Sequence, residues 1–448
     1  MLGRVVTTVS EVPYEAQPGH EIPVAMPTAH YRFGVSARFL LGPEEPFRSY
    51  PVRMSSPNPE SFVPRAIYLD QSVYSSMLSA SSDWKSTSIG EILLEARESG
   101  RGQVWAGPTN VIETIQAQDI DLRKRLAGMI LDLIEGRRMW CGFEFELLDE
   151  YFRFLEMLVP GAVRHRQFFD YYREIGQRIW LGALAMAAAT DADWLVPVVE
   201  DLRHTKTMNQ LIHARFALDP DRWVEGMREA STRLATSEDD PLAALEAMTT
   251  EEMRSEIAQL MARTQRLGNA AMQKLNRNRS EVAAVYGAFE IGALLQNVFK
   301  LPYDLELTVD VPLLIRSWDD TTQLKREPLP RYIRETPEDQ WEGNPQIAKD
   351  VLQRTIRVAA RMNLPVLGIG FEVILREMQR NMNQRQLPTA GLAFDGDHAS
   401  AINRHHIFVT FDDGLANALK AIVNAPKTGV RWHTTIVINE RQLADALK

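Results

Sequence analysis

The sequence predicts an α/β protein, with a three-layer α/β/α core around a mostly parallel sheet and a large all-helical insertion. Three observations support this class. Short apolar runs alternate with helical patterns over 65–158, the alternation returns over 386–448, and residues 159–385 between them carry mostly helical patterns. Strands that alternate with helices usually form a parallel sheet. The two α/β portions are expected to be halves of one sheet, because neither has enough strands for a stable core alone.

The first α/β portion is predicted to contain three strands that alternate with helices. Its strands are expected at 66–69, 103–107 and, more weakly, 137–143. Its helices are expected after Asp70, near 88–99, from Pro108, over 122–134 and over 146–159. The helix over 122–134 is the clearest, because its apolar residues recur every three or four positions while charged residues fill the opposite face.

The remaining parts of the chain show different patterns. Residues 1–64 are rich in proline and short β-prone pieces, which predicts an extended or β-rich arm. Within the helical region 159–385, the proline-dotted, charged stretch 301–346 is typical of loops. Because this region is far longer than an ordinary loop, it is expected to be an insertion. After it, strands are expected at 406–410 and 434–439, with helices beside them.

The composition is that of an ordinary globular chain. Its 448 residues are 45% hydrophobic and 24% charged, and its one cysteine, Cys141, cannot form an internal disulfide, which fits a cytoplasmic location. The N-terminal residues lack a signal-peptide pattern, and the most apolar run, 180–190, is too short to span a membrane, so no membrane association is expected. The net charge of −9 argues against indiscriminate coating of nucleic acid but allows a local basic groove.

Four acidic residues occupy positions where a strand ends or a helix begins. They are Asp70, Glu113, Asp397 and Asp412. The carboxyl ends of parallel strands meet at one edge of the sheet, which is where sites form. Carboxylate oxygens are the ligands that Mg²⁺ and Mn²⁺ prefer. Each aspartate could instead be a helix N-cap, and Glu113 a surface charge, but the agreement of all four positions favours a metal site.

These segments resemble the PIN-domain (PIN-like) family of metal-dependent nucleases. The resemblance rests on four short motifs that cover 65–158 and 386–440, under half of the chain: "IYLDQS", "TNVIE", "DGDHASAI" and "IFVTFDDG". The chain departs from the family in its very large insertion. The "DGD" motif also leaves the third ligand open between Asp395 and Asp397, and Asp397 is preferred because it directly precedes the helical "HASAI".

The resemblance implies an endoribonuclease that hydrolyses RNA with bound Mg²⁺ or Mn²⁺. The implied ligands are Asp70, Glu113, Asp397 and Asp412, with Asp395 as the alternative. Thr410 is expected to orient Asp412 or the attacking water, and Ser72 to contact the substrate. Arg277 and Arg279 are candidate phosphate contacts, because basic residues alternate there with asparagine just before an apolar helix. His398 is expected to be a polar residue at a helix start, with phosphate or metal binding as the alternative.

Two other functions fit the same sequence. A PIN-like fold can serve as a non-catalytic scaffold that binds a protein partner through its helical insertion. A structure-specific DNA nuclease would use the same carboxylates on another substrate. The resemblance also implies that the chain could form a homodimer.

Overall fold

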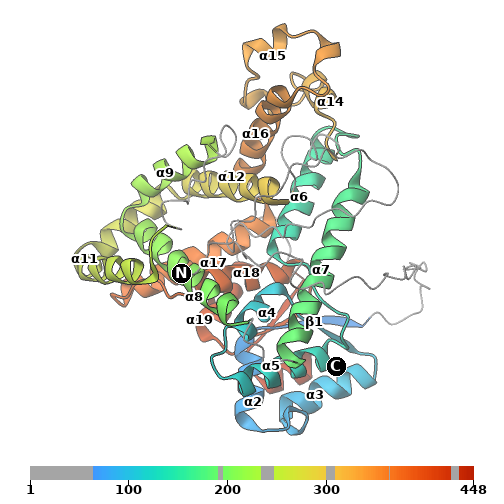
Figure 1. Ribbon diagram of the computed structural model, residues 1–448, viewed down its shortest axis with the longest axis vertical. Coiled ribbons are helices and arrows are strands. Elements are labelled where there is room, and N and C mark those ends of the chain that lie inside the picture. Colours follow the sequence, from blue (N-terminus) through green and yellow to red (C-terminus); the bar gives the residue numbers. More distant parts are fainter. Residues whose placement is uncertain (1–63, 190–194, 234–246, 299–307, 363, 425–432) are drawn as a thin grey trace, which may run out of the picture.

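The computed structural model describes residues 64–189, 195–233, 247–298, 308–362, 364–424 and 433–448. The described part is mostly helical and contains one small sheet (Figure 1). The arm predicted for the first 64 residues lies outside the described residues, apart from Pro64.

The sheet is entirely parallel and joins segments from both ends of the described chain. Its strands are β1 (Arg65–Leu69), β2 (Gly102–Trp105), β3 (Ile407–Val409) and β4 (Thr435–Val437), in the order β2-β1-β3-β4. The central pair brings Ile67 opposite Ile407 and Leu69 opposite Val409. The expectation that the two α/β portions share one sheet is therefore confirmed, although β2, β3 and β4 are shorter than expected.

The strand predicted at 137–143 is reduced to a single bridge. Met139 pairs with Ala106 in parallel, and the amide of Trp140 donates a 2.7 Å hydrogen bond to the carbonyl oxygen of Ala106. Gly142 then adopts a φ of +94° and leads directly into the next helix, so pairing cannot continue. The bridge lies on the outer side of β2.

Five longer helices accompany the first two strands, and the predicted helices agree with them closely. They are α2 (Gln71–Ala80), α3 (Ser88–Glu98), α4 (Pro108–Ile115), α5 (Ile120–Leu133) and α6 (Phe143–Leu158). Local signals determine their ends. Thr87 and Asp119 cap α3 and α5 with their side-chain oxygens, and Gly100 ends α3 with a φ of +69°.

The described part of the insertion is built from helices that pack onto the sheet-bearing core. They are α7 (Arg166–Ala189), α8 (Leu195–Leu218), α9 (Pro220–Arg233), α11 (Thr250–Arg277), α12 (Arg279–Val298), α14 (Val311–Arg316), α15 (Arg331–Glu335), α16 (Pro345–Arg361) and α17 (Pro365–Asn383). Helix α7 contacts α4 and α5, and α8 also reaches α4. In the described residues no single helix could span a membrane, although α16 and α17, bent by 59°, pass that test as a pair.

Three helices complete the C-terminal portion: α18 (Leu392–Ser400), α19 (Asp413–Val423) and α20 (Glu440–Ala446). Helix α17 packs along both α18 and α19 (Figure 1). Helix α18 begins earlier than the sequence suggested, because Leu392 and Phe394 are buried and hold its first turn in place. Asp397 is therefore an interior residue of this helix, not the residue before it.

The two faces of the sheet belong to different hydrophobic clusters. Along β1, Ile67 and Leu69 belong to the cluster that includes α2 to α5, whereas Tyr68 points to the opposite face, where its ring packs against Trp140 and Phe408. This alternation is the period of two expected of a strand, and all three side chains are fully buried. Both faces of the sheet are thus covered, so its functional edge is the one where the strands end.

Candidate metal centre

The strand order creates a switch point between β1 and β3. The chain proceeds from β1 to β2 on one side, and later from β3 to β4 on the other. In open parallel sheets, the carboxyl ends of strands at such a point diverge into a crevice where ligands bind. Asp70 directly follows β1, and Thr410 directly follows β3. Both predicted residues therefore lie at this edge.

Asp70 caps a helix and also belongs to a buried polar cluster. Its Oδ1 accepts a 2.7 Å hydrogen bond from the backbone amide of Gln71, the first residue of α2. Its Oδ2 accepts hydrogen bonds from the hydroxyls of Ser72 at 2.6 Å and Thr410 at 2.9 Å. Only 6% of Asp70 is exposed. Three hydrogen-bond donors thus fix this carboxylate in one orientation, with Oδ1 facing the centre of the cluster.

The roles of Thr410 and Ser72 differ from those expected. Thr410 donates to Asp70 and accepts a 3.1 Å hydrogen bond from the backbone amide of Asp412, so it orients Asp70 and not the Asp412 carboxylate. Ser72 donates to Asp70 and accepts a 2.9 Å hydrogen bond from the amide of Phe411. Its hydroxyl links the segments after β1 and β3. A substrate contact by Ser72 stays a prediction.

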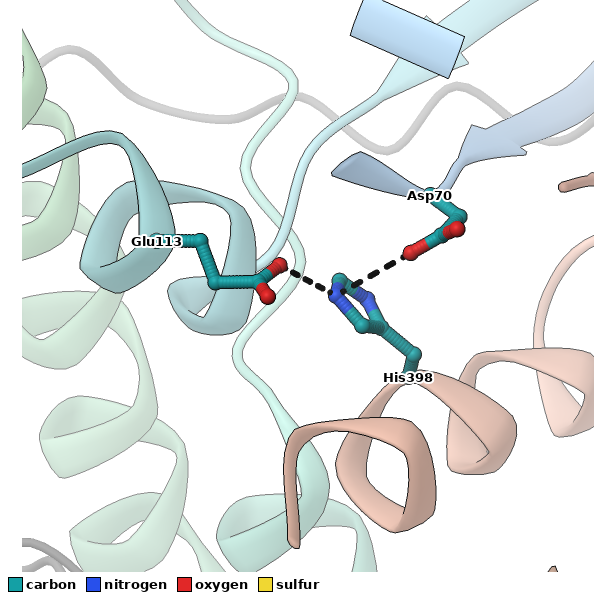
Figure 2. A group of neighbouring side chains, drawn as sticks. All are labelled: Asp70, Glu113 and His398. Atoms are coloured by element: carbon teal, nitrogen blue, oxygen red, sulfur yellow. Dashed lines mark hydrogen bonds and ion pairs between the residues drawn. The ribbon is translucent and has the colours of Figure 1, made fainter. Parts of the chain in front are cut away.

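Glu113 and His398 complete a compact cluster with Asp70. Glu113 projects from α4 and His398 from α18, and all three side chains converge (Figure 2). The Nε2 atom of His398 lies 2.9 Å from Oε2 of Glu113 and 3.4 Å from Oδ1 of Asp70. Its Nδ1 atom is hydrogen-bonded to the hydroxyl of Tyr68 at 2.8 Å. One ligand atom from each of the three residues lies within 4.8 Å of the other two.

His398 carries a positive charge in the metal-free protein. Burial alone would lower the pKa of its imidazole, but the hydrogen bond that Nε2–H donates to Glu113 and the charges of Asp70, Glu113 and Asp395 raise this pKa to about 9. The expectation of a polar residue at a helix start is wrong, since His398 lies in the last turn of α18 and only 1% of it is exposed. The imidazolium offsets part of the negative charge that converges at this edge.

Of the two aspartates of the "DGD" motif, Asp395 is the one whose charge interacts with Asp70, Glu113 and His398. Burial raises the pKa of Asp395 well above its usual range, and the charges of Asp70 and Glu113 raise it further. Residues three apart share one face of a helix, so Asp395 and His398 both face the cluster. Asp397 is two positions from Asp395, on the opposite side of α18, where it lines a small pocket with Phe143 and other residues.

Asp412 lies at the margin of the cluster. Its Oδ1 accepts a 2.9 Å hydrogen bond from the amide of Leu415, which makes it the N-cap of α19. Its negative charge nevertheless contributes to the raised pKa values of Asp395 and Glu377. Asp412 is thus a helix cap whose charge raises the pKa of Asp395, and it does not belong to the group formed by Asp70, Glu113 and His398.

The insertion reaches this edge, but not through the two predicted arginines. Lys206 of α8 lies with its ammonium 5.4 Å from the ring centroid of Phe394, next to Asp395. Arg279, at the start of α12, forms an ion pair with Glu372 of α17. Arg277 is exposed at the end of α11. The described contacts of Arg279 place it beside α17, two turns of that helix away from Arg380.

Sequence reasoning gave His398 a metal-binding role only as the alternative, and it missed Tyr68 as the support of this histidine. A usable signal was present, because Asp395 and His398 are separated by three residues within a helical pattern. Nothing in the alternation of β1 indicated that Tyr68 would hydrogen-bond a histidine 330 residues later.

Comparisons with known proteins add no relatives. No protein-family model, curated protein or solved structure matches this chain.

Proposed function

We propose that this chain is a PIN-like, metal-dependent endoribonuclease with a three-layer α/β/α core. The convergence of Asp70, Glu113 and His398 within 4.8 Å, at the switch point of a parallel sheet, is the observation that carries the proposal. Asp395 and Asp412 add negative charge beside this group. Hydrolysis of RNA and a cytoplasmic location are parts of the same proposal, and they rest on the sequence motifs.

The donor atoms suit a divalent cation. Two carboxylates and one imidazole offer ligand atoms that lie within 4.8 Å of one another, and the charge of Asp395 acts on the same group. Carboxylates held close together without a cation repel one another. Burial is the main cause of the raised pKa of Asp395, and repulsion by Asp70 and Glu113 raises this pKa further. Asp70, Glu113 and Asp395 would hold Mg²⁺ or Mn²⁺, with Nε2 of His398 available as a nitrogen ligand once it is deprotonated. Such an ion lowers the pKa of bound water and stabilises charge on a phosphate.

The protein's own residues prepare this site. Thr410 and Ser72 hold Oδ2 of Asp70, so that Oδ1 faces inward. Tyr68 fixes the ring of His398 through Nδ1, which directs Nε2 towards Glu113. The buried surroundings strengthen each of these interactions.

Cleavage of labelled RNA and DNA of the same sequence tests the proposal. The wild-type protein should cleave RNA in Mn²⁺ or Mg²⁺ and not in EDTA. Asp70→Asn should slow cleavage by about 100-fold, because it removes the ligand charge while keeping an oxygen that can cap α2. Asp83→Asn, at an exposed cap outside the cluster, should cleave normally. Equal rates for wild type and Asp70→Asn, or metal-independent cleavage, would reject the nuclease.

A non-catalytic scaffold is the second candidate, and the position of His398 favours it. Its imidazolium already lies between Asp70 and Glu113, so the cluster is partly neutralised without a metal. In that case Mn²⁺ and Mg²⁺ would leave the melting temperature unchanged. The helical insertion would then bind a protein partner or a second copy of the chain. A metal-dependent rise in melting temperature that Asp70→Asn abolishes would exclude this alternative.

A further inference from the structure

A row of arginines leads along α17 to the candidate metal centre. Arg376 and Arg380 are four residues apart, so they lie on one face of the helix, about 6 Å apart along its axis. Glu372 precedes them by one more turn on the same face and pairs with Arg279 of α12. Arg279, Arg376 and Arg380 therefore form a continuous basic row from the start of α12 to the end of α17.

The inner end of this row touches the site edge. A Cβ atom added to Gly414, in the first turn of α19, would collide with the Arg380 guanidinium. Asp412 caps the same turn, and its amide is bonded to Thr410, which in turn holds Asp70. Arg380 thus lies within one helical turn of the residues that orient the metal ligands.

Acidic partners hold the guanidinium groups in place without burying them. Arg380 pairs with Glu377 at 2.5 Å, and Nε of Arg376 pairs with Glu372 at 2.8 Å. The three arginine side chains keep 39–43% of their surface exposed. Arg279 and Arg376 share Glu372, so the row has more cations than anions. Burial lowers the pKa of Arg279, and the nearby charge of Arg376 lowers it further. An arriving anion would relieve this crowding.

A site lined with carboxylates repels a phosphodiester unless cations flank it. We propose that Arg279, Arg376 and Arg380 bind consecutive phosphates of a single nucleic-acid strand and guide it to the carboxylate cluster. This inference rests on the proposed function for the identity of the cluster, but the binding itself does not require cleavage. Arginine suits the role because its planar guanidinium can bond phosphate oxygens and an ion-pair partner together.

The test is binding of fluorescent single-stranded RNA, and of DNA of the same sequence, followed by anisotropy in EDTA over a series of KCl concentrations. The double variant Arg376→Gln with Arg380→Gln should bind about tenfold more weakly at low salt. The slope of log K against log salt should fall by about 1 to 1.5, the value for two lost phosphate contacts on a single strand. The double variant Arg376→Lys with Arg380→Lys keeps both positive charges and should retain most of the slope of log K against log salt.

The matched control is the double variant Arg331→Gln with Arg334→Gln. These arginines also lie on one helix and pair with carboxylates, but α15 is at the far end of the molecule from α19 (Figure 1). The control has the same net charge as the test variant and should bind like wild type. Equal slopes for test and control variants, or no strand binding by wild type, would overturn the inference.

Failure of this inference is distinguishable from failure of the proposed function. The protein could bind the strand through these arginines and yet cleave with no divalent metal. That result would support the phosphate-binding role of the arginines and reject the nuclease function. Metal-dependent cleavage, with strand binding that is unchanged by the arginine substitutions, would support the nuclease function and reject the role of the arginines.

Discussion

Thr410 and Asp70 are 340 residues apart in the chain, yet the Thr410 hydroxyl donates a 2.9 Å hydrogen bond to Oδ2 of Asp70. The amide of Asp70 also donates a 2.9 Å hydrogen bond to the carbonyl oxygen of Val409, the last residue of β3. Pairing of β1 with β3 therefore positions the first candidate ligand. The candidate site therefore forms only when β1 pairs with β3, a strand that follows the insertion in the chain.

We expect Thr410→Val to weaken both folding and metal binding. The valine has nearly the same shape but removes the donor to Asp70 and leaves the Asp412 amide without its partner. The free energy of unfolding should fall by about 1–3 kcal/mol, since the hydroxyl is fully buried. Urea denaturation measures this loss, and calorimetric titration with Mn²⁺ should show an affinity lower by about tenfold.

Thr434→Val is the control for this change. Thr434 is also buried, and its hydroxyl donates to the carbonyl oxygens of Ile402 and His405, away from the cluster. It should destabilise the protein to a similar extent and leave the Mn²⁺ affinity unchanged. If both valine variants bound Mn²⁺ equally well, Thr410 would have no role beyond stability.

The two aspartates of the "DGD" motif should respond differently to substitution. Asp395→Asn removes a carboxylate that repels Asp70 and Glu113, so the metal-free protein should unfold at the same or a higher temperature. The same variant should bind Mn²⁺ about 10 to 100 times more weakly. Asp397→Asn should leave the Mn²⁺ affinity unchanged, because this side chain lies on the other side of α18. A larger loss of affinity in Asp397→Asn would contradict the assignment of Asp395.

Stability should depend on pH through Glu150. Burial raises the pKa of this carboxyl from its ordinary 4.5 to about 8, although the backbone amide of Val366 donates to it. Between these values the folded protein binds more protons than the unfolded chain. The contribution of Glu150 to the free energy of unfolding is therefore complete below about pH 4.5 and is lost as the pH rises through 8. Glu150→Gln should remove this loss, about 4 kcal/mol between pH 5 and 9.

Denaturation with urea at several pH values checks the Glu150 prediction. Glutamine keeps an oxygen that can accept from the Val366 amide, so the fold should persist. Glu98→Gln, at an exposed position in α3, is the control and should retain the wild-type pH profile. A Glu150→Gln profile that runs parallel to wild type would show that Glu150 is ionised in the folded protein across this range.

Gly414→Ala should separate strand binding from stability. The added methyl group must displace the Arg380 guanidinium, which is the far end of a flexible side chain. The change in the free energy of unfolding should stay within about 1 kcal/mol, because alanine favours the helix more than glycine does. Affinity for single-stranded RNA should nevertheless fall, as measured by anisotropy, because Arg380 is moved from its position.

Gly292→Ala provides the comparison for Gly414→Ala. Gly292 lies within α12, where an added methyl group meets no described atom within 4 Å. This variant should be more stable by about 0.5–1 kcal/mol and bind RNA like wild type. Unchanged RNA affinity in Gly414→Ala would argue against a phosphate contact by Arg380.

Short-range patterns predicted most of the fold around the sheet. The strand before Asp70, the helix opened by Pro108 and the caps at Asp70 and Asp412 were all predictable, because each depends on a few neighbouring residues. The parallel sheet with its helical interruption was also predictable from the alternation of elements. The strand at 137–143 was not, since its apolar residues form one bridge before Gly142 turns the chain.

The sequence by itself therefore determined which carboxylates stand at the ends of strands and the starts of helices. Only the tertiary structure decided which of them converge. The choice between Asp395 and Asp397, the burial of His398 and the position of Arg380 depend on how α17 and α18 pack against α4 and α19. A rotation of about 100° per residue separates neighbouring side chains on a helix, so the packed face sets which side chain faces the site. That face is chosen by contacts between segments hundreds of residues apart, which no local pattern contains.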